Sequence, residues 1–156
     1  MSTYSIRNIE TEQNKQYSRE RINALYKSKL LRTDNEIKTF EENLELLSET
    51  FDEGDIVELC SVFDDNTEHS EVMFGMVHLL ETLSSEEVFE NTVKGLIKMS
   101  ETSPEWTDII VGRCLNDKYS VQMINRVKNR LDEQSAEKFK ELWTKGSEGG
   151  TANDKK

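Results

Sequence analysis

The chain has 156 residues, of which 35% are hydrophobic and 33% are charged, and its formal net charge is −11. This length suits one domain with a sizeable core, and the hydrophobic share disfavours a disordered chain. One proline and seven glycines are too few turn residues for a β-sandwich, so the composition favours an all-α protein.

Apolar residues recur at helical spacing from residue 18 to residue 144, which we interpret as one all-α domain. Residues 1–17 are polar and are interpreted as a lead-in or as the fraying start of a helix, and residues 145–156 as a flexible tail. Because the connections are short, we expect seven or eight helices stacked as antiparallel hairpins, in a HEAT-like superhelix or an irregular bundle. The expected helices span residues 18–31, 34–50, 55–63, 68–83, 84–101, 104–115, 118–132 and 135–144.

Several of these helices begin at residues that typically cap a helix. A polar side chain at this position accepts a hydrogen bond from a free backbone N–H group of the first turn. Proline at the first helical position and a glutamate three residues after the cap strengthen the signal. The expected caps are Thr33, Asn66 or Thr67, Ser84 with Glu87, and Ser103 before Pro104.

Charge is distributed unevenly along the chain. Residues 33–103 carry three Lys and nineteen acids, a net charge of −16, and no basic residue lies between Lys38 and Lys94. Residues 1–32 are net +4 and residues 104–156 are net +1. Nucleic-acid binding requires a basic face that neutralises phosphates, so the central segment predicts a basic protein partner instead.

The termini and cysteines indicate a cytoplasmic protein. The N-terminal sequence lacks the apolar region of a signal peptide, and no apolar run approaches the roughly 20 residues of a membrane span, so we expect no membrane partner. Cys60 and Cys114 lie within apolar helical patterns, which is typical of small buried hydrophobic residues, although a disulfide stays open.

The stretch SVFDDNTEHSEVMFGMVHLLE, residues 61–81, gathers side chains that could bind a metal ion. An EF-hand loop beginning at Asp64 would need glycine at its sixth position and glutamate at its twelfth, where the chain has His69 and Gly75. His78 and Glu81 have the reverse order of the Glu-x-x-His pairs of di-iron proteins. These mismatches lead us to predict no catalytic, metal or cofactor site.

Polar residues set in apolar stretches predict a structural network instead. Such residues are tolerated in a buried or half-buried position when they are hydrogen-bonded to one another. The residues expected in this network are His78, Glu81, Arg113 and Asn116.

The same residues carry a resemblance to a known family. The chain resembles the immunity protein 30 family of bacterial polymorphic toxin systems over roughly residues 36–143, through Leu59-Cys60, Phe63-Asp64-Asp65, Glu71-Val72-Met73-Phe74-Gly75, His78-Leu79-Leu80-Glu81, Trp106 and Arg113-Cys114-Leu115-Asn116. The resemblance implies an all-α cytoplasmic protein, without catalysis, that neutralises a cognate toxin by binding it. Many toxins of these systems are nucleases with basic clefts, which an acidic segment could occupy.

Partner-binding residues are therefore expected among the central acids. Trp106 joins them because tryptophan is frequent at interface anchors, although a core position is the competing interpretation. A helical interaction scaffold and a metal-dependent phosphohydrolase on a helical bundle stay as alternative functions. The predicted partner-binding residues are Asp52, Glu53, Asp55, Glu58, Asp64, Asp65, Glu68, Glu71 and Trp106.

Overall fold

The computed structural model describes residues 3–154, with the side chains of residues 11–148. All regular structure in this range is helical, which confirms the predicted all-α class. The elements are α1 (Thr3–Ser28), α2 (Asp34–Leu47), η1 (Glu53–Asp55), α3 (Ile56–Cys60), α4 (Ser70–Leu80), α5 (Glu86–Met99), α6 (Pro104–Leu115), α7 (Lys118–Val127), η2 (Lys128–Arg130) and α8 (Glu133–Asp154). None of the helices within the described range is long and apolar enough to cross a membrane.

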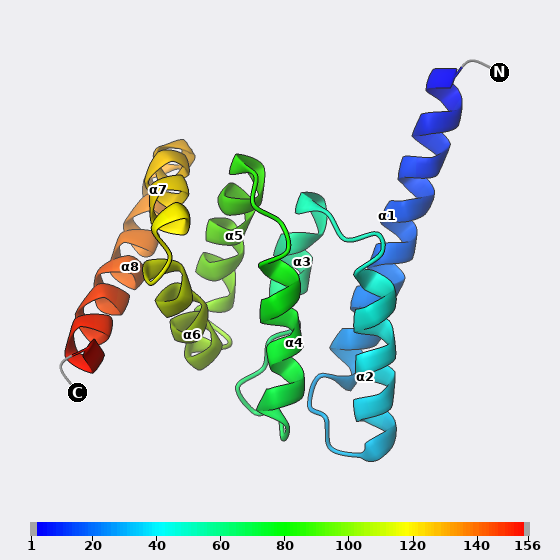
Figure 1. Ribbon diagram of the computed structural model, residues 1–156, viewed down its shortest axis with the longest axis horizontal. Coiled ribbons are helices and arrows are strands. Elements are labelled where there is room, and N and C mark those ends of the chain that lie inside the picture. Colours follow the sequence, from blue (N-terminus) through cyan, green and yellow to red (C-terminus); the bar gives the residue numbers. More distant parts are fainter. Residues whose placement is uncertain (1–2, 155–156) are drawn as a thin grey trace.

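The helices stand side by side in a row, with α1 and α2 at one end and α7 and α8 at the other (Figure 1). α1 and α2 form an antiparallel pair, and further along the row α3 packs on α5, α5 on α7 and α6 on α8. Packing between helices two apart in the chain is typical of a layered stack. Whether this stack has the regular geometry of HEAT repeats stays a prediction.

The core forms from the apolar face of each helix. In α2 the buried residues Phe40 and Leu47 are seven positions apart, which places them two turns apart on one face. Each such side chain contributes about 2–3 kcal/mol when it leaves water. α5 lies close to α3 because Gly95 has no side chain: an added Cβ would lie 2.5 Å from Cys60 Sγ. The helices that carry the acidic segment are therefore firmly held.

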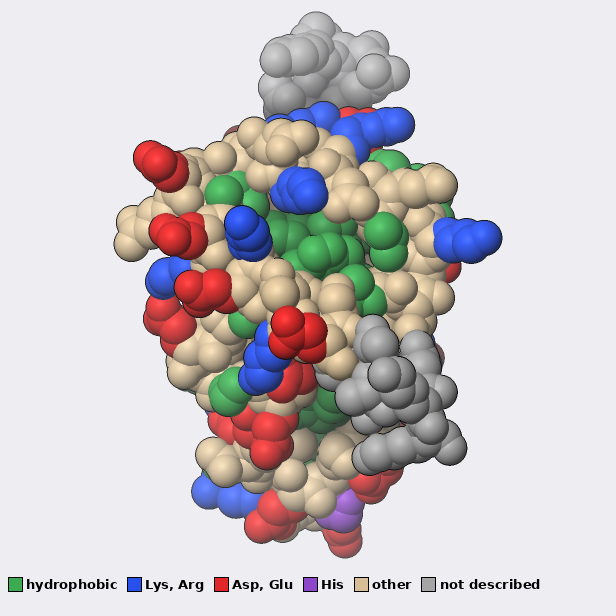
Figure 2. All heavy atoms as spheres, turned by 90° about the vertical axis from the view of Figure 1, so that its left-hand side faces the viewer, with side chains coloured by type: hydrophobic (Ala, Val, Ile, Leu, Met, Phe, Trp, Pro, Cys, Tyr) green, Lys and Arg blue, Asp and Glu red, His purple; other side chains and the backbone are tan. Residues whose placement is uncertain are grey.

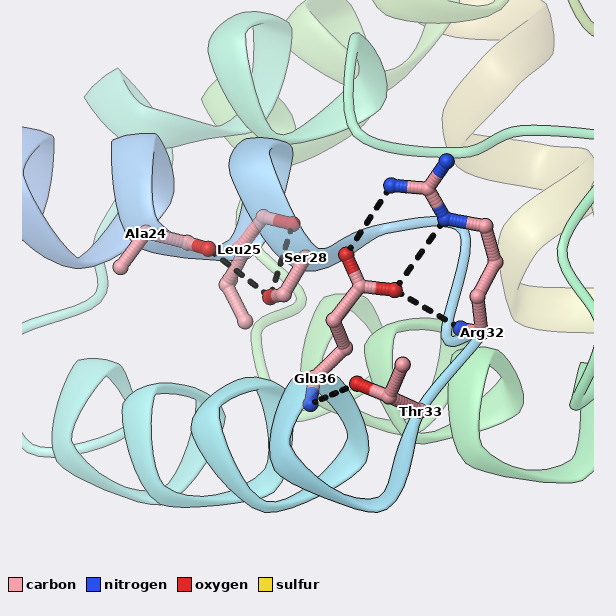
Figure 3. Close-up of polar contacts among 6 residues, drawn as sticks. All are labelled: Ala24, Leu25, Ser28, Arg32, Thr33 and Glu36. Atoms are coloured by element: carbon pink, nitrogen blue, oxygen red, sulfur yellow. Dashed lines mark hydrogen bonds and ion pairs between the residues drawn. The ribbon is translucent and has the colours of Figure 1, made fainter.

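The corner between α1 and α2 is fixed by local hydrogen bonds (Figure 3). Thr33 Oγ1 accepts a hydrogen bond from Glu36 N at 3.0 Å, which confirms the predicted cap. The Arg32 guanidinium pairs with the Glu36 carboxylate, which also accepts a hydrogen bond from Arg32 N at 2.8 Å, and these contacts lower the pKa of Glu36. Leu31 takes a left-handed conformation, with φ of 51°, and its fully buried side chain offsets the backbone strain.

The two ends of the chain compare differently with the prediction: residues 3–17 are helical, in agreement with one of the two interpretations, whereas the predicted flexible tail is helical as far as Asp154. α1 begins at Thr3, and Figure 1 shows its N-terminal part extending beyond α2. α8 continues past Lys145, because Gly146 packs against α6: an added Cβ would lie 2.6 Å from Val111 Cγ1. The glycine thus permits a close helix contact instead of ending the helix. The division of the chain into a lead-in (1–17), one domain (18–144) and a tail (145–156) stays a prediction.

Two of the expected caps lie at the wrong position in the chain. α4 begins at Ser70, after Asn66 and Thr67, and the residue before it makes no side-chain cap. Ser85, not Ser84, accepts the hydrogen bond from Val88 N at the start of α5. Each error is a shift of one to three residues, the usual uncertainty of a helix boundary read from a sequence.

Candidate interaction site

Asp65 caps the first turn of α6 from a distant loop. Its two carboxylate oxygens accept hydrogen bonds from Glu105 N at 3.0 Å and Trp106 N at 3.1 Å. Negative charge is favourable at a helix N-terminus, where backbone N–H groups lack partners. Ser103, the expected cap, instead donates its hydroxyl to the Phe63 carbonyl at 2.6 Å. Asp65 therefore holds α6 on the loop, which does not fit the prediction that it faces a partner.

Asp64 is also bound within the protein. Its carboxylate accepts a hydrogen bond from Asn66 N at 2.8 Å and lies 3.4 Å from the ammonium group of Lys29 on α1. Both side chains of this ion pair are only 20% exposed. The prediction that Asp64 is a free partner-facing acid is thus not supported by its position.

Trp106 belongs to the core. Its side chain is 4% exposed and packs against the rings of Phe63 and Phe74, with centroids 5.4 and 5.8 Å apart. Its indole N–H donates to the Asp64 carbonyl at 3.1 Å. Of the two interpretations of this tryptophan, the core position agrees with the structure and the partner-binding position does not.

Asp55 is buried in the turn before α3. It is 7% exposed, and its carboxylate accepts from Asp52 N at 3.1 Å, while the Asp52 carboxylate accepts from Gly54 N at 2.9 Å. Burial raises the pKa of Asp55, and the hydrogen bond from Asp52 N partly opposes this rise. Asp55 therefore completes a reciprocal cap and is withdrawn from the surface.

The other predicted acids are accessible, and all except Glu58 on α3 lie near the two ends of α2. Asp52, Glu58, Glu68 and Glu71 are exposed and Glu53 is half-buried. Glu68 N donates to the Leu30 carbonyl at 2.9 Å, which holds Glu68 and Glu71 near the start of α2. Asp52 and Glu53 follow soon after its last residue.

A set of exposed acids on α2 itself was missed. The apolar face of α2, with Phe40 and Leu47, points inward, so the intervening glutamates point to solvent. The ion pair between Lys38 and Glu42, 4.0 Å long, is the one salt bridge that a base makes with them among the described residues. The helical period of residues 34–47 could have identified this surface. We name it the acidic ridge, formed by Glu41, Glu42, Glu45 and Glu49 on α2 and the turn that follows it.

The face at the α7–α8 end has a different character. Figure 2 shows hydrophobic side chains gathered near its middle, with both basic and acidic side chains around them. This agrees with the near-balanced charge of residues 104–156, which carry ten Lys or Arg and nine acids. A large excess of one charge is therefore a property of the central segment.

Three of the four predicted network residues meet on the surface. Arg113 donates two hydrogen bonds to the Glu81 carboxylate, at 2.9 and 2.7 Å, and thereby joins α6 to the end of α4. His78 Nδ1 lies 3.9 Å from Glu81. Asn116 ends α6 through its backbone N–H group. His78, at 67% exposed, and the exposed Asn116 are not buried as predicted, whereas Arg113 and Glu81, 40% and 44% exposed, do tie two helix ends together.

Both cysteines are shielded from solvent as unreactive thiols. Burial raises the pKa of both thiols, Cys60 and Cys114, to about 12, which keeps them protonated and weakly nucleophilic at neutral pH. Within residues 11–148 no group of three or more His, Cys, Asp or Glu side chains is placed to hold a metal ion.

Comparison with known protein families gives a match. The model of a family described as immunity protein 30 matches residues 27–124, a range that contains the acidic ridge and the Arg113–Glu81 pair. Neither a curated protein nor a solved structure matches the chain.

Proposed function

Because the chain belongs to the immunity protein 30 family, we propose that it binds a cognate protein toxin of a bacterial polymorphic toxin system and neutralises it. The family match is the observation that carries this proposal. Inhibition is stoichiometric and needs no catalytic group on this chain. The protein acts in the cytoplasm, where it protects the cell that makes the toxin.

The toxin binds at the acidic ridge. Four glutamates lie on or next to one helix, with Glu68 and Glu71 near its start and Asp52 and Glu53 after its end. Such a concentration of one charge attracts a basic surface over a distance and raises the association rate. A nuclease toxin with a basic cleft has the complementary charge. This ridge replaces Asp55, Asp64, Asp65 and Trp106 as the centre of the partner-binding surface.

The ridge is also rigid enough to bind without a large ordering cost. α2 is anchored by Phe40 and Leu47, both fully buried, and its start is capped by Thr33. Because the helix is already ordered, the glutamate side chains alone lose freedom on binding. Rigid placement favours one docking geometry over many weak ones.

The direct test is calorimetric titration of the purified chain with the toxin domain encoded beside its gene, repeated at increasing salt. We expect a complex of one chain per toxin whose affinity falls as salt screens the ridge. Absence of any complex would refute the immunity function. A complex whose affinity does not respond to salt would leave immunity standing and refute the electrostatic role of the ridge.

A further inference from the structure

A groove with a volume of about 510 Å³ lies where α4 and α6 end and α5 and α7 begin. Buried apolar side chains form much of its lining, among them Val77, Leu80, Phe89 and Ile110. No residue of α2 lines it, so the groove is separate from the acidic ridge. Its volume falls within the range of clefts that enclose a ligand, about 300–1,000 Å³, so it is large enough to receive a side chain.

Contacts between neighbouring elements hold the groove in shape. Tyr119 on α7 donates its hydroxyl to the Ser84 carbonyl at 2.8 Å, and the Arg113–Glu81 pair joins α6 to α4. All four of these residues line the groove. A site that exists before binding costs little to organise, which favours tight binding.

Tyr119 gives the groove an exposed aromatic side chain. Its ring is 47% exposed and meets the ring of Phe89 edge-on, with centroids 5.8 Å apart. Tyrosine is enriched among the residues that dominate protein interfaces, since it combines apolar area with a polar end. An exposed tyrosine above a buried apolar floor suits a protein partner.

The charges in the groove favour a cation. Its charged lining residues are Glu81, Arg113 and Asp117; the first two form a bidentate pair, and Asp117, which caps the start of α7, has no salt-bridge partner among residues 11–148. The Asp117 carboxylate accepts hydrogen bonds from Ser120 Oγ at 2.7 Å and Ser120 N at 3.0 Å, which lower its pKa. It is therefore ionised at neutral pH and held in one position.

We propose that the groove receives an apolar side chain of the toxin, with a neighbouring lysine or arginine of the toxin placed against Asp117. This inference rests on the proposed function and adds a second contact surface to it. The ridge speeds association through charge, whereas the groove slows dissociation through apolar burial. Charge at the ridge alone would attract many basic proteins, and the shape of the groove selects among them.

The test measures association and dissociation rates of the toxin domain with two matched tryptophan variants. Asn116 is exposed, lines the groove and has an ordinary helical conformation, so Asn116→Trp covers the groove without straining the backbone. Gln122→Trp adds the same side chain to an exposed position of α7 outside the groove. We expect Asn116→Trp to bind at least about tenfold more weakly, through faster dissociation, and Gln122→Trp to match the unmodified chain.

Asp117→Asn provides a second variant if Asn116→Trp fails to fold. Asparagine caps a helix as well as aspartate does, so α7 keeps its start while the groove loses its charge. We expect weaker binding by about threefold to tenfold and a smaller salt dependence.

The outcomes separate this inference from the function on which it rests. If the unmodified chain binds the toxin and the folded groove variants bind equally well, the groove is refuted and immunity stands. If the unmodified chain binds no toxin, the proposed function fails and the groove inference fails with it.

Discussion

The aspartates Asp55, Asp64 and Asp65, between α2 and α4, and the glutamates of the acidic ridge carry the same charge and have different roles. Asp55, Asp64 and Asp65 accept hydrogen bonds from backbone N–H groups, each at a turn or helix start. Glu41 and Glu45 point to solvent from the middle of α2. A carboxylate beside free N–H groups stabilises the fold, whereas one in a helix interior has its local N–H groups already bonded. Charge alone therefore does not identify a binding surface.

The junction between residues 61–69 and α6 should be the most sensitive part of this comparison. Trp106→Ala removes a buried ring from between Phe63 and Phe74, and we expect a loss of about 3–5 kcal/mol in the free energy of unfolding. Urea denaturation followed by circular dichroism measures this loss. Normal stability combined with lost toxin binding would instead return Trp106 to the interface.

Asp65→Ala should have the next largest effect on stability. The variant leaves Glu105 N and Trp106 N without their acceptor, and loss of a helix cap costs about 0.5–2 kcal/mol. Asp65→Asn retains one acceptor oxygen and should lose less. Glu45→Ala is the control on the ridge, because it removes an exposed acid and should leave the urea midpoint nearly unchanged. Equal losses for Asp65→Ala and Glu45→Ala would contradict the distinction drawn between the two groups of acids.

The ridge should show the opposite pattern, with an effect on affinity and little on stability. Changing Glu41, Glu42, Glu45 and Glu49 to Gln removes four charges, and we expect toxin affinity to fall about tenfold, equivalent to ~1.4 kcal/mol. The matched control changes four exposed glutamates of α8 to Gln, so the net charge is the same and the location differs. These are Glu133, Glu137, Glu141 and Glu148.

Titration of both variants with the toxin domain separates a local effect from a general one. If the α8 variant loses as much affinity as the ridge variant, total charge matters and the position of the ridge does not.

The helices could be predicted from the sequence because their signals are local. Apolar spacing located each helix, and Thr33 marked the start of α2 correctly. The family resemblance was also carried by short stretches in order along the chain, and the family match confirms it.

The roles of individual side chains could not be predicted, because they depend on residues far apart in the chain. Asp65 caps a helix that begins about 40 residues later, and no local pattern indicates this contact. Gly146 lies in the segment predicted as a flexible tail, and its close approach to Val111 on α6 is likewise not visible in the sequence. The exposure of the side chains of His78, Glu81 and Arg113 also depends on tertiary structure, because it is set by how the last turns of α4 and α6 lie relative to each other.

The smallest effect we predict concerns Asp55, the acid that most sharply contrasts with the ridge. Burial raises its pKa in the folded protein above the value in the unfolded chain. The folded state therefore binds a proton more readily, so the resulting stabilisation is complete below the unfolded pKa and is lost as pH rises through the folded pKa.

Asp55→Asn should expose this dependence, because asparagine does not titrate. We expect the substitution to reduce the free energy of unfolding more at about pH 4 than at about pH 7. Urea denaturation of both proteins across this range measures the difference, with Glu58→Gln as a control for losing one exposed charge on the adjacent helix. If Asp55→Asn instead costs more stability at pH 7 than at pH 4, the hydrogen bond from Asp52 N to the ionised carboxylate outweighs the cost of burying its charge. Asp55 would then resemble Asp65, with its charge serving the cap directly.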